Sequence, residues 1–121
     1  MSNPYNCVDV SEWNGEINWP KAHDDDVFNA FIRCGFGQNI ETQDDKYFHI
    51  NMENAISAGV KVGVYFYSYA VNADQARKEA EHCIRLIEPY KNQISFPVFY
   101  DVEESSIEDI NYLQEGMIIR A

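Results

Sequence analysis

The chain has little positive charge, few cysteines and no long apolar run. Nine lysines and arginines stand against 20 aspartates and glutamates, so the formal net charge is −11 over 121 residues. A field of this sign repels the phosphates of nucleic acids and anionic membrane surfaces, and neither is expected as a partner. No segment approaches the length of a transmembrane helix, and the first five residues show neither the basic nor the apolar region of a signal peptide.

The three cysteines, Cys7, Cys34 and Cys83, are widely spaced and odd in number. They form no CxxC pair and no cluster with histidine, which argues against a zinc site, and a disulfide scaffold is not expected in a chain of this size. We expect small buried thiols. No cofactor and no metal site is predicted.

What the chain does contain is a hydrophobic fraction of 45% with 14% aromatic residues, which is enough for one folded domain with a core. Runs of β-forming residues alternate with helical patterns. Strands are expected at residues 7–10, 27–34, 60–69 and 96–104, and helices at 21–23, 44–58, 72–86 and from 105 onward. This alternation predicts parallel βαβ units and an α/β fold. Strands that are apolar on both faces fit a parallel β/α barrel of the TIM type, here only its first four strands.

The carboxyl-terminal ends of the predicted strands carry the candidate functional residues, because functional side chains of parallel α/β folds gather there. Asp101 and Glu103 are spaced i, i+2, so they project to one side of a strand at a Cα separation of roughly 6–7 Å. Asp9 lies near the end of the first strand. Other side chains expected at this edge are Arg33, Tyr65, Tyr67 and Tyr69.

These residues support more than one interpretation. Asp101 and Glu103 could flank a scissile bond or, together with Asp9, supply oxygen ligands to Mg²⁺ or Mn²⁺ in a metal-dependent hydrolase. A saccharide-binding half-barrel without catalysis is a third interpretation. Tyrosines at a period of two residues also occur in cores, and Trp13 could either pack against the protein or stack on a sugar at the rim.

Taken together, the motifs resemble the lysozymes of glycoside hydrolase family 25. The matching segments run in order through nearly the whole chain. They are Val8-Asp9-Val10-Ser11, Asn14-Gly15, Ile17-Asn18-Trp19, Phe31-Ile32-Arg33 with Gly35, Asp45, Phe48, Asn51, Ala55, Ala58-Gly59-Val60, Gly63-Val64-Tyr65, Tyr67-Ser68-Tyr69-Ala70, Ala76, Glu79-Ala80, Pro97-Val98 and Asp101-Val102-Glu103.

The resemblance implies a flattened β/α barrel that cleaves the β-1,4 bond between N-acetylmuramic acid and N-acetylglucosamine in peptidoglycan. It implies Glu103 as the general acid, Asp101 as the carboxylate that stabilises positive charge, and Asp9 as a residue that holds and polarises the site. The candidates for substrate binding are Tyr65, Tyr67, Arg33 and Trp13. Whether the second step uses the 2-acetamido group of the substrate or a direct attack by water stays open.

Four strands are fewer than such a barrel requires, since a (β/α)₈ barrel typically takes about 200–250 residues. We expect residues 1–121 to form the N-terminal part of a single catalytic barrel, without its later strands. The polypeptide alone is then expected to have little or no lytic activity, unless self-association through the open sheet edge completes the cleft. A compact open sheet is the other alternative. The expected place of action is the bacterial cell wall, reached by phage-style lysis or by another export route.

Overall fold

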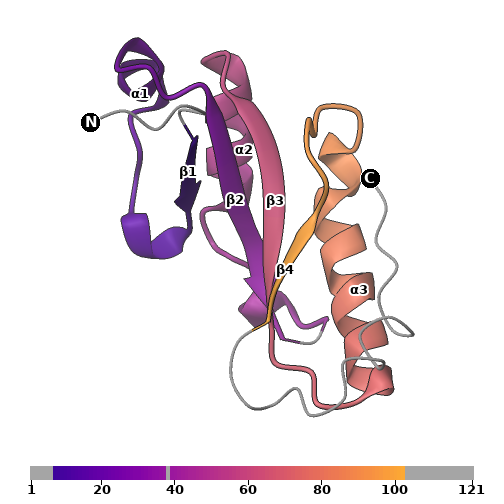
Figure 1. Ribbon diagram of the computed structural model, residues 1–121. Helices are drawn as coiled ribbons and strands as arrows, with labels where there is room; N and C mark the ends of the chain where they lie inside the picture. The colour runs from indigo at the N-terminus through magenta and orange to yellow at the C-terminus, as the bar shows by residue number, and fades with distance from the viewer. Residues whose placement is uncertain (1–6, 38, 103–121) are drawn as a thin grey trace.

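A parallel, four-stranded sheet organises the computed structural model, which describes residues 7–37 and 39–102 (Figure 1). The strands follow one another in chain order across the sheet, and each neighbouring pair is parallel. The elements are β1 (Cys7–Val10), η1 (Glu12–Asn14), α1 (Trp19–Asp24), β2 (Asn29–Phe36), η2 (Glu41–Gln43), α2 (Phe48–Ser57), β3 (Lys61–Ser68), α3 (Ala73–Ile87), η3 (Glu88–Tyr90) and β4 (Phe99–Val102). The predicted α/β fold is confirmed, and the arrangement is that of an incomplete β/α barrel.

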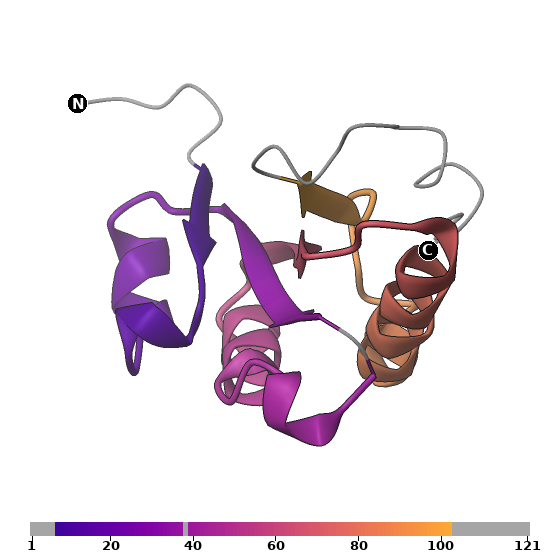
Figure 2. The same cartoon turned by 90° about the horizontal axis from the view of Figure 1, so that it is seen from below.

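The helices α2 and α3 pack on one face of the sheet, and the opposite face carries no helix among the described residues (Figure 2). The side chains of β3 show the division: Val62, Val64 and Phe66 are fully buried beneath the helices. Tyr65 and Tyr67 lie on the other face and are half-buried. Because successive side chains of a strand point to opposite faces, one set of β3 residues builds the core and the other faces the site. We call the helix-free side the open face.

The core between the sheet and the helices holds two of the three cysteines. Cys34 of β2 and Cys83 of α3 are buried free thiols whose Sγ atoms lie 3.7 Å apart. Burial raises the pKa of the Cys34 thiol well above its usual range, which keeps it protonated and unreactive. The expectation of buried thiols is confirmed for this pair but wrong for Cys7, which is only partly buried because it lies on the edge strand β1.

The helix α2 begins at Phe48, later than residue 44 where it was predicted. The preceding segment is bound to other elements instead: the amide of Asp45 donates to the carbonyl of Cys34 at 2.8 Å. The carboxylate of Asp44 accepts from Arg85 Nη2 at 2.7 Å. The helix therefore starts only after Asp44 and Asp45, which are hydrogen-bonded to α3 and β2. The helix predicted from residue 105 lies outside the described residues.

None of the described helices combines the length and the hydrophobicity needed to cross a lipid bilayer.

The strand β2 continues past Cys34, where it was predicted to end, and it does so through a bulge. The partners across β2 and β3 are Arg33–Tyr65, Gly35–Phe66 and Phe36–Tyr67, which leaves Cys34 as the additional residue. A bulge changes the face to which the following side chains point. Gly35 therefore packs toward α3, and Phe36 turns to the open face beside Tyr67.

The bulge depends on the absence of a side chain at Gly35. A Cβ atom at this position would lie 2.8 Å from the carbonyl oxygen of Gln43 and 3.3 Å from the ring of His82. His82 of α3 is completely buried, and its Nε2 lies 2.7 Å from Oδ1 of Asp44. The ring is fixed, so the neighbouring chain has no space for a methyl group.

We expect Gly35→Ala to lower the free energy of unfolding by about 1–3 kcal/mol, because the added methyl group must displace a backbone carbonyl and a buried ring. Urea denaturation followed by circular dichroism measures the change. Asn54→Ala on the exposed side of α2 is the control, and it should alter stability by less than about 0.5 kcal/mol. Wild-type stability of the Gly35→Ala variant would contradict this account of the bulge.

Candidate active site

A hollow of about 410 Å³ opens on the open face of the sheet. It is lined by Asp9, Phe31, Tyr65, Phe99, Tyr100 and Asp101. Asp9 comes from β1, Tyr65 from β3 and Asp101 from β4, so residues far apart in the sequence share one site. The expectation that Asp9 and Asp101 approach one another was made from parallel strand ends alone, and the structure places both at this hollow. Glu103 lies outside the described residues.

The floor of the hollow is aromatic. The ring of Phe31 lies 5.2 Å from that of Phe96 and 5.4 Å from that of Phe99, measured between centroids. Gly63 of β3 makes this packing possible, because a Cβ there would lie 2.6 Å from the Phe31 ring. The register pairs Asp9 with Phe31 and Phe31 with Gly63, so the carboxylate of Asp9 lies beside this apolar floor.

The pKa of Tyr65 is affected by both carboxylates of the hollow. Burial, followed by the negative charge of Asp9, raises the pKa of its phenol to about 12. The charge of Asp101 acts in the same direction, and that of Arg33 opposes it. The phenol therefore remains protonated across the physiological pH range and can donate a hydrogen bond.

Tyr67 extends the site along the open face. It pairs in register with Asp101 of β4, so the two side chains are neighbours on the sheet. Its ring lies 4.8 Å from that of Tyr69, and the Tyr69 ring lies 6.0 Å from that of Phe36. Aromatic side chains thus continue from Asp101 toward the end of β2.

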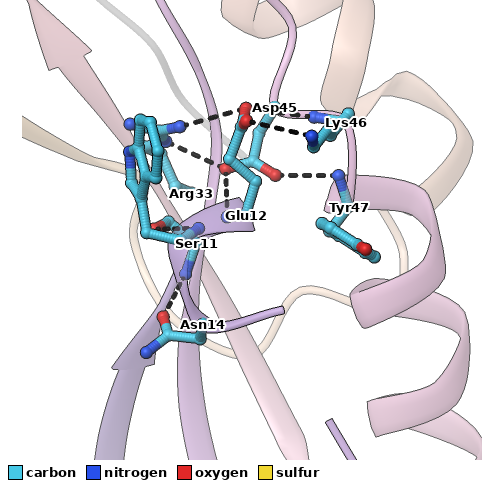
Figure 3. A network of polar contacts seen from close by, with 8 residues as sticks. Ser11, Glu12, Asn14, Arg33, Asp45, Lys46 and Tyr47 are labelled. Carbon is cyan, nitrogen blue, oxygen red and sulfur yellow. Dashed lines mark hydrogen bonds and ion pairs between the residues drawn. The ribbon is translucent and has the colours of Figure 1, made fainter. Parts of the chain in front are cut away.

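Arg33 belongs to a buried polar network at the end of β2 (Figure 3). Its Nε donates to Oδ2 of Asp45 at 2.9 Å, and its Nη2 lies 3.4 Å from Oε1 of Glu12. The same Oδ2 accepts from the amide of Glu12 at 2.9 Å, while Oδ1 accepts from the amide of Tyr47 at 2.9 Å. One carboxylate therefore joins the turn after β1, the end of β2 and the start of α2.

The side chain of Arg33 is 11% exposed, and its Cζ lies 5.7 Å from the centroid of the Phe36 ring. Its positive charge is already paired with the carboxylates of Asp45 and Glu12. Direct contact between Arg33 and a substrate stays a prediction. Sequence reasoning missed Asp45 as an organising residue, because residues 44–58 were all assigned to a helix. The signal available was a pair of adjacent acidic residues directly before the apolar pattern of α2.

Trp13 lies in the turn after β1 and is 82% exposed. Ser11 fixes this turn: its Oγ accepts from the amide of Trp13 at 3.3 Å, and its own amide donates to Oδ1 of Asn14 at 2.8 Å. The packing interpretation of Trp13 is therefore wrong, whereas a role in binding stays a prediction. Trp19 is the indole that packs, since it is buried and donates to Asn51 Oδ1 at 3.2 Å.

Within residues 7–37 and 39–102, no group of three or more His, Cys, Asp or Glu side chains could hold a metal ion. The metal-dependent interpretation also required Glu103, which is outside this range.

Comparison with known proteins identifies the family. The model of the Glycosyl hydrolases family 25 matches residues 8–117. Lysozyme M1 of Streptomyces globisporus is 33% identical over 75 residues, which are 62% of this chain and 24% of that protein.

Solved structures show the same fold. The modular autolysin LytC from Streptococcus pneumoniae, solved in complex with a synthetic peptidoglycan ligand, superposes with a TM-score of 0.74 at 30% identity, over 92% of this chain and 29% of that one. A family 25 glycosyl hydrolase from Bacillus anthracis gives 0.74 at 26% identity, over 96% of this chain and 54% of that one. The chain thus spans between about a quarter and about half of the length of these relatives.

We expect Asp45→Ala to lower the free energy of unfolding by roughly 3–5 kcal/mol, because it leaves the buried guanidinium of Arg33 with a weaker partner and removes the acceptor of two backbone amides. Urea denaturation measures this loss. Asp74→Ala, which removes only exposed ion pairs on α3, is the matched control and should change stability by less than about 1 kcal/mol. Equal effects of the two variants would refute the organising role of Asp45.

Proposed function

The chain belongs to glycosyl hydrolases family 25, and on this premise we propose that it contributes to a lysozyme that cleaves the β-1,4 bond between N-acetylmuramic acid and N-acetylglucosamine. The observation that carries the proposal is the hollow in which Asp9 and Asp101 lie with Tyr65 beside an aromatic floor. Paired carboxylates beside a space for a sugar ring are the groups that glycoside hydrolysis requires. The peptidoglycan ligand of LytC supports the choice of substrate.

Glu103 is proposed as the general acid that protonates the leaving sugar oxygen. It follows Asp101 by two positions, so a strand that continued past Val102 would direct both side chains to one face. Asp101 stabilises the positive charge that develops on the sugar, and Asp9 holds and polarises the site. Crowding by these two carboxylates favours the protonated form of Glu103 by like-charge repulsion.

Substrate binding is proposed for side chains around this centre. Tyr65 contacts the sugar whose bond is broken, with its phenol as a hydrogen-bond donor. Tyr67 extends this contact beside Asp101, and the exposed indole of Trp13 offers a face for stacking at the rim. Arg33 is also proposed to bind the substrate, while it keeps its ion pairs with Asp45 and Glu12.

We propose further that residues 1–121 form the N-terminal part of one catalytic barrel whose site of action is the bacterial cell wall. The coverage of the solved relatives supports the first statement, and the autolysin among them supports the second. β4 lies at an edge of the described sheet, where a second copy of the chain could pair with it.

At protein concentrations where the self-associated chain hydrolyses purified peptidoglycan, Glu103→Gln should reduce the release of new reducing ends by at least about 100-fold, since it removes the proton donor. Pelleting with the same peptidoglycan should show that binding survives. Glu104→Gln is the matched control, a neighbouring carboxylate without a proposed role, and it should keep wild-type activity. Retained hydrolysis by Glu103→Gln would remove the acid role, and inhibition by EDTA would favour the metal-dependent interpretation instead.

The 121-residue polypeptide should show little or no hydrolysis while it is a monomer. Any activity should increase more than linearly with protein concentration, because a second copy must supply the rest of the cleft. Light scattering together with the peptidoglycan assay measures both quantities. Robust turnover by a demonstrated monomer would refute this proposal.

A further inference from the structure

Two buried thiols lie in contact in the core and have no part in the proposed chemistry. Cys34 of β2 and Cys83 of α3 are 49 positions apart in the sequence, both are fully buried, and their Sγ atoms lie 3.7 Å apart. A disulfide bond is about 2.05 Å long, so the two sulfurs would have to approach by a further ~1.7 Å. Rotation of both side chains about χ1 moves the sulfurs over this range, provided that the two backbones stay in place.

The backbones of β2 and α3 are held together at this point by two consecutive aspartates. The amide of Asp45 donates to the carbonyl of Cys34 at 2.8 Å. Oδ1 of Asp44 lies 2.7 Å from Nε2 of His82, the residue directly before Cys83. The segment that contains Asp44 and Asp45 therefore fixes the two cysteines relative to each other.

A glycine beside the thiols allows the strand and the helix to approach. Gly35 follows Cys34, and a Cβ atom on it would lie 3.3 Å from the ring of His82. The pairs Cys34–Cys83 and Gly35–His82 are thus neighbouring contacts between β2 and α3. Two reacting groups held in this way have a high effective concentration, which favours a bond between them over bonds to separate thiols.

The same surroundings keep the folded thiols from reacting. Burial, followed by the contact with Cys83, raises the pKa of the Cys34 thiol well above its usual range, and the charge of Asp45 acts in the same direction. Thiol–disulfide exchange requires a thiolate that can reach its reagent. A bond between the two cysteines therefore has to form before the core closes. Once formed, it suits an apolar core, because a disulfide carries neither a charge nor a polar hydrogen.

We propose that Cys34 and Cys83 become joined by a disulfide bond when the chain folds in the presence of a small-molecule disulfide. One cysteine thiolate attacks a sulfur of the reagent, whose S–S bond breaks to give a mixed disulfide and one reagent thiolate. The second cysteine thiolate attacks the protein sulfur of the mixed disulfide and releases the second reagent thiolate. The two protons lost by the cysteines are taken up by the two reagent thiolates, so the cysteines are oxidised and the reagent is reduced.

This bond joins the bulge of β2 to α3. Cys34 is the additional residue of the bulge, and Phe36 follows it by two positions. Phe36, Tyr67 and Asp101 form one row across β2, β3 and β4, because each pairs in register with the next. The cross-link therefore fixes, from the helix side, the residue that determines on which face this row begins. It also closes a loop that contains α2 and β3, which restricts the unfolded chain.

The test uses the Cys7→Ser chain, in which only the two core thiols remain. The chain is unfolded in urea with a reductant, freed of the reductant and refolded with oxidised glutathione. Mass spectrometry should show the loss of two hydrogens without attached glutathione, and a proteolytic digest should contain the peptides of Cys34 and Cys83 joined together. The cross-linked chain should melt about 10 °C above the same chain kept reduced.

Cys34→Ala in the same background is the matched control. It leaves one core thiol, so it should carry one glutathione or none, and the reagent should not raise its melting temperature. Cys83→Ala is the second control if the first variant does not fold, and the reduced Cys7→Ser chain is a control of unchanged sequence. Circular dichroism establishes that each chain is folded.

A second measurement follows the route by which the bond forms. The native, reduced Cys7→Ser chain should be cross-linked by the same reagent at least about tenfold more slowly than the refolding chain, because both thiols are buried. Equal rates would overturn the requirement for an open core.

Two results would overturn the bond itself. A refolded Cys7→Ser chain whose two thiols stay free, or each carry a glutathione, would show that the core does not bring the sulfurs to bonding distance. In wild type, a bond from Cys7 to either core cysteine would overturn the pairing. The proposed lysozyme chemistry is unaffected by either result, since the test uses no glycan.

Discussion

The carboxylate of Asp45 is the interaction on which the functional end of the sheet depends. It is the common acceptor for the side chain of Arg33 and for the amides of Glu12 and Tyr47. These donors belong to three separate parts of the chain, so a single buried anion sets the distance between the turn after β1, the end of β2 and the start of α2. A buried carboxylate is stable only when its oxygens are satisfied in this way. The end of β1, which carries Asp9, is therefore fixed by a residue that does not itself line the hollow.

The bulge in β2 links the helix side of the sheet to its open face. Gly35 is packed against His82 of α3, and one residue later Phe36 lies on the opposite face under the guanidinium of Arg33. Two successive residues of β2 thus contact α3 on one face and the row of side chains beside Asp101 on the other. Interiors packed this tightly pass on displacements instead of absorbing them.

The sequence was sufficient to predict those features that repeat along a strand. The period of two residues in β3 predicted that Tyr65, Tyr67 and Tyr69 share one side of the strand, and the rule that parallel strands end at one edge predicted that Asp9 and Asp101 lie at the same edge. Features that depend on one local irregularity could not be predicted in this way. The bulge at Cys34 leaves no mark in a pattern of period two, and Asp45 resembles any acidic residue before a helix until its three donors are known. Arg33 was expected at the right edge, but its ion pairs come from segments that only the fold brings near.

The charge of Arg33 also bears on why the hollow remains anionic. A guanidinium beside two carboxylates would normally offset them, but this one is already held by Asp45 and Glu12. Burial is the largest cause of the raised pKa of Tyr65, and among the charges around its phenol the effect of Asp9 is larger than the opposing effect of Arg33. A hollow of this sign repels anions and favours a ligand that gains positive charge during reaction, as a glycosidic carbon does when its bond breaks. The Asp45 network therefore serves the proposed chemistry in two ways. It positions the end of β1, and it pairs the guanidinium of Arg33, whose positive charge would otherwise offset the negative charges of Asp9 and Asp101.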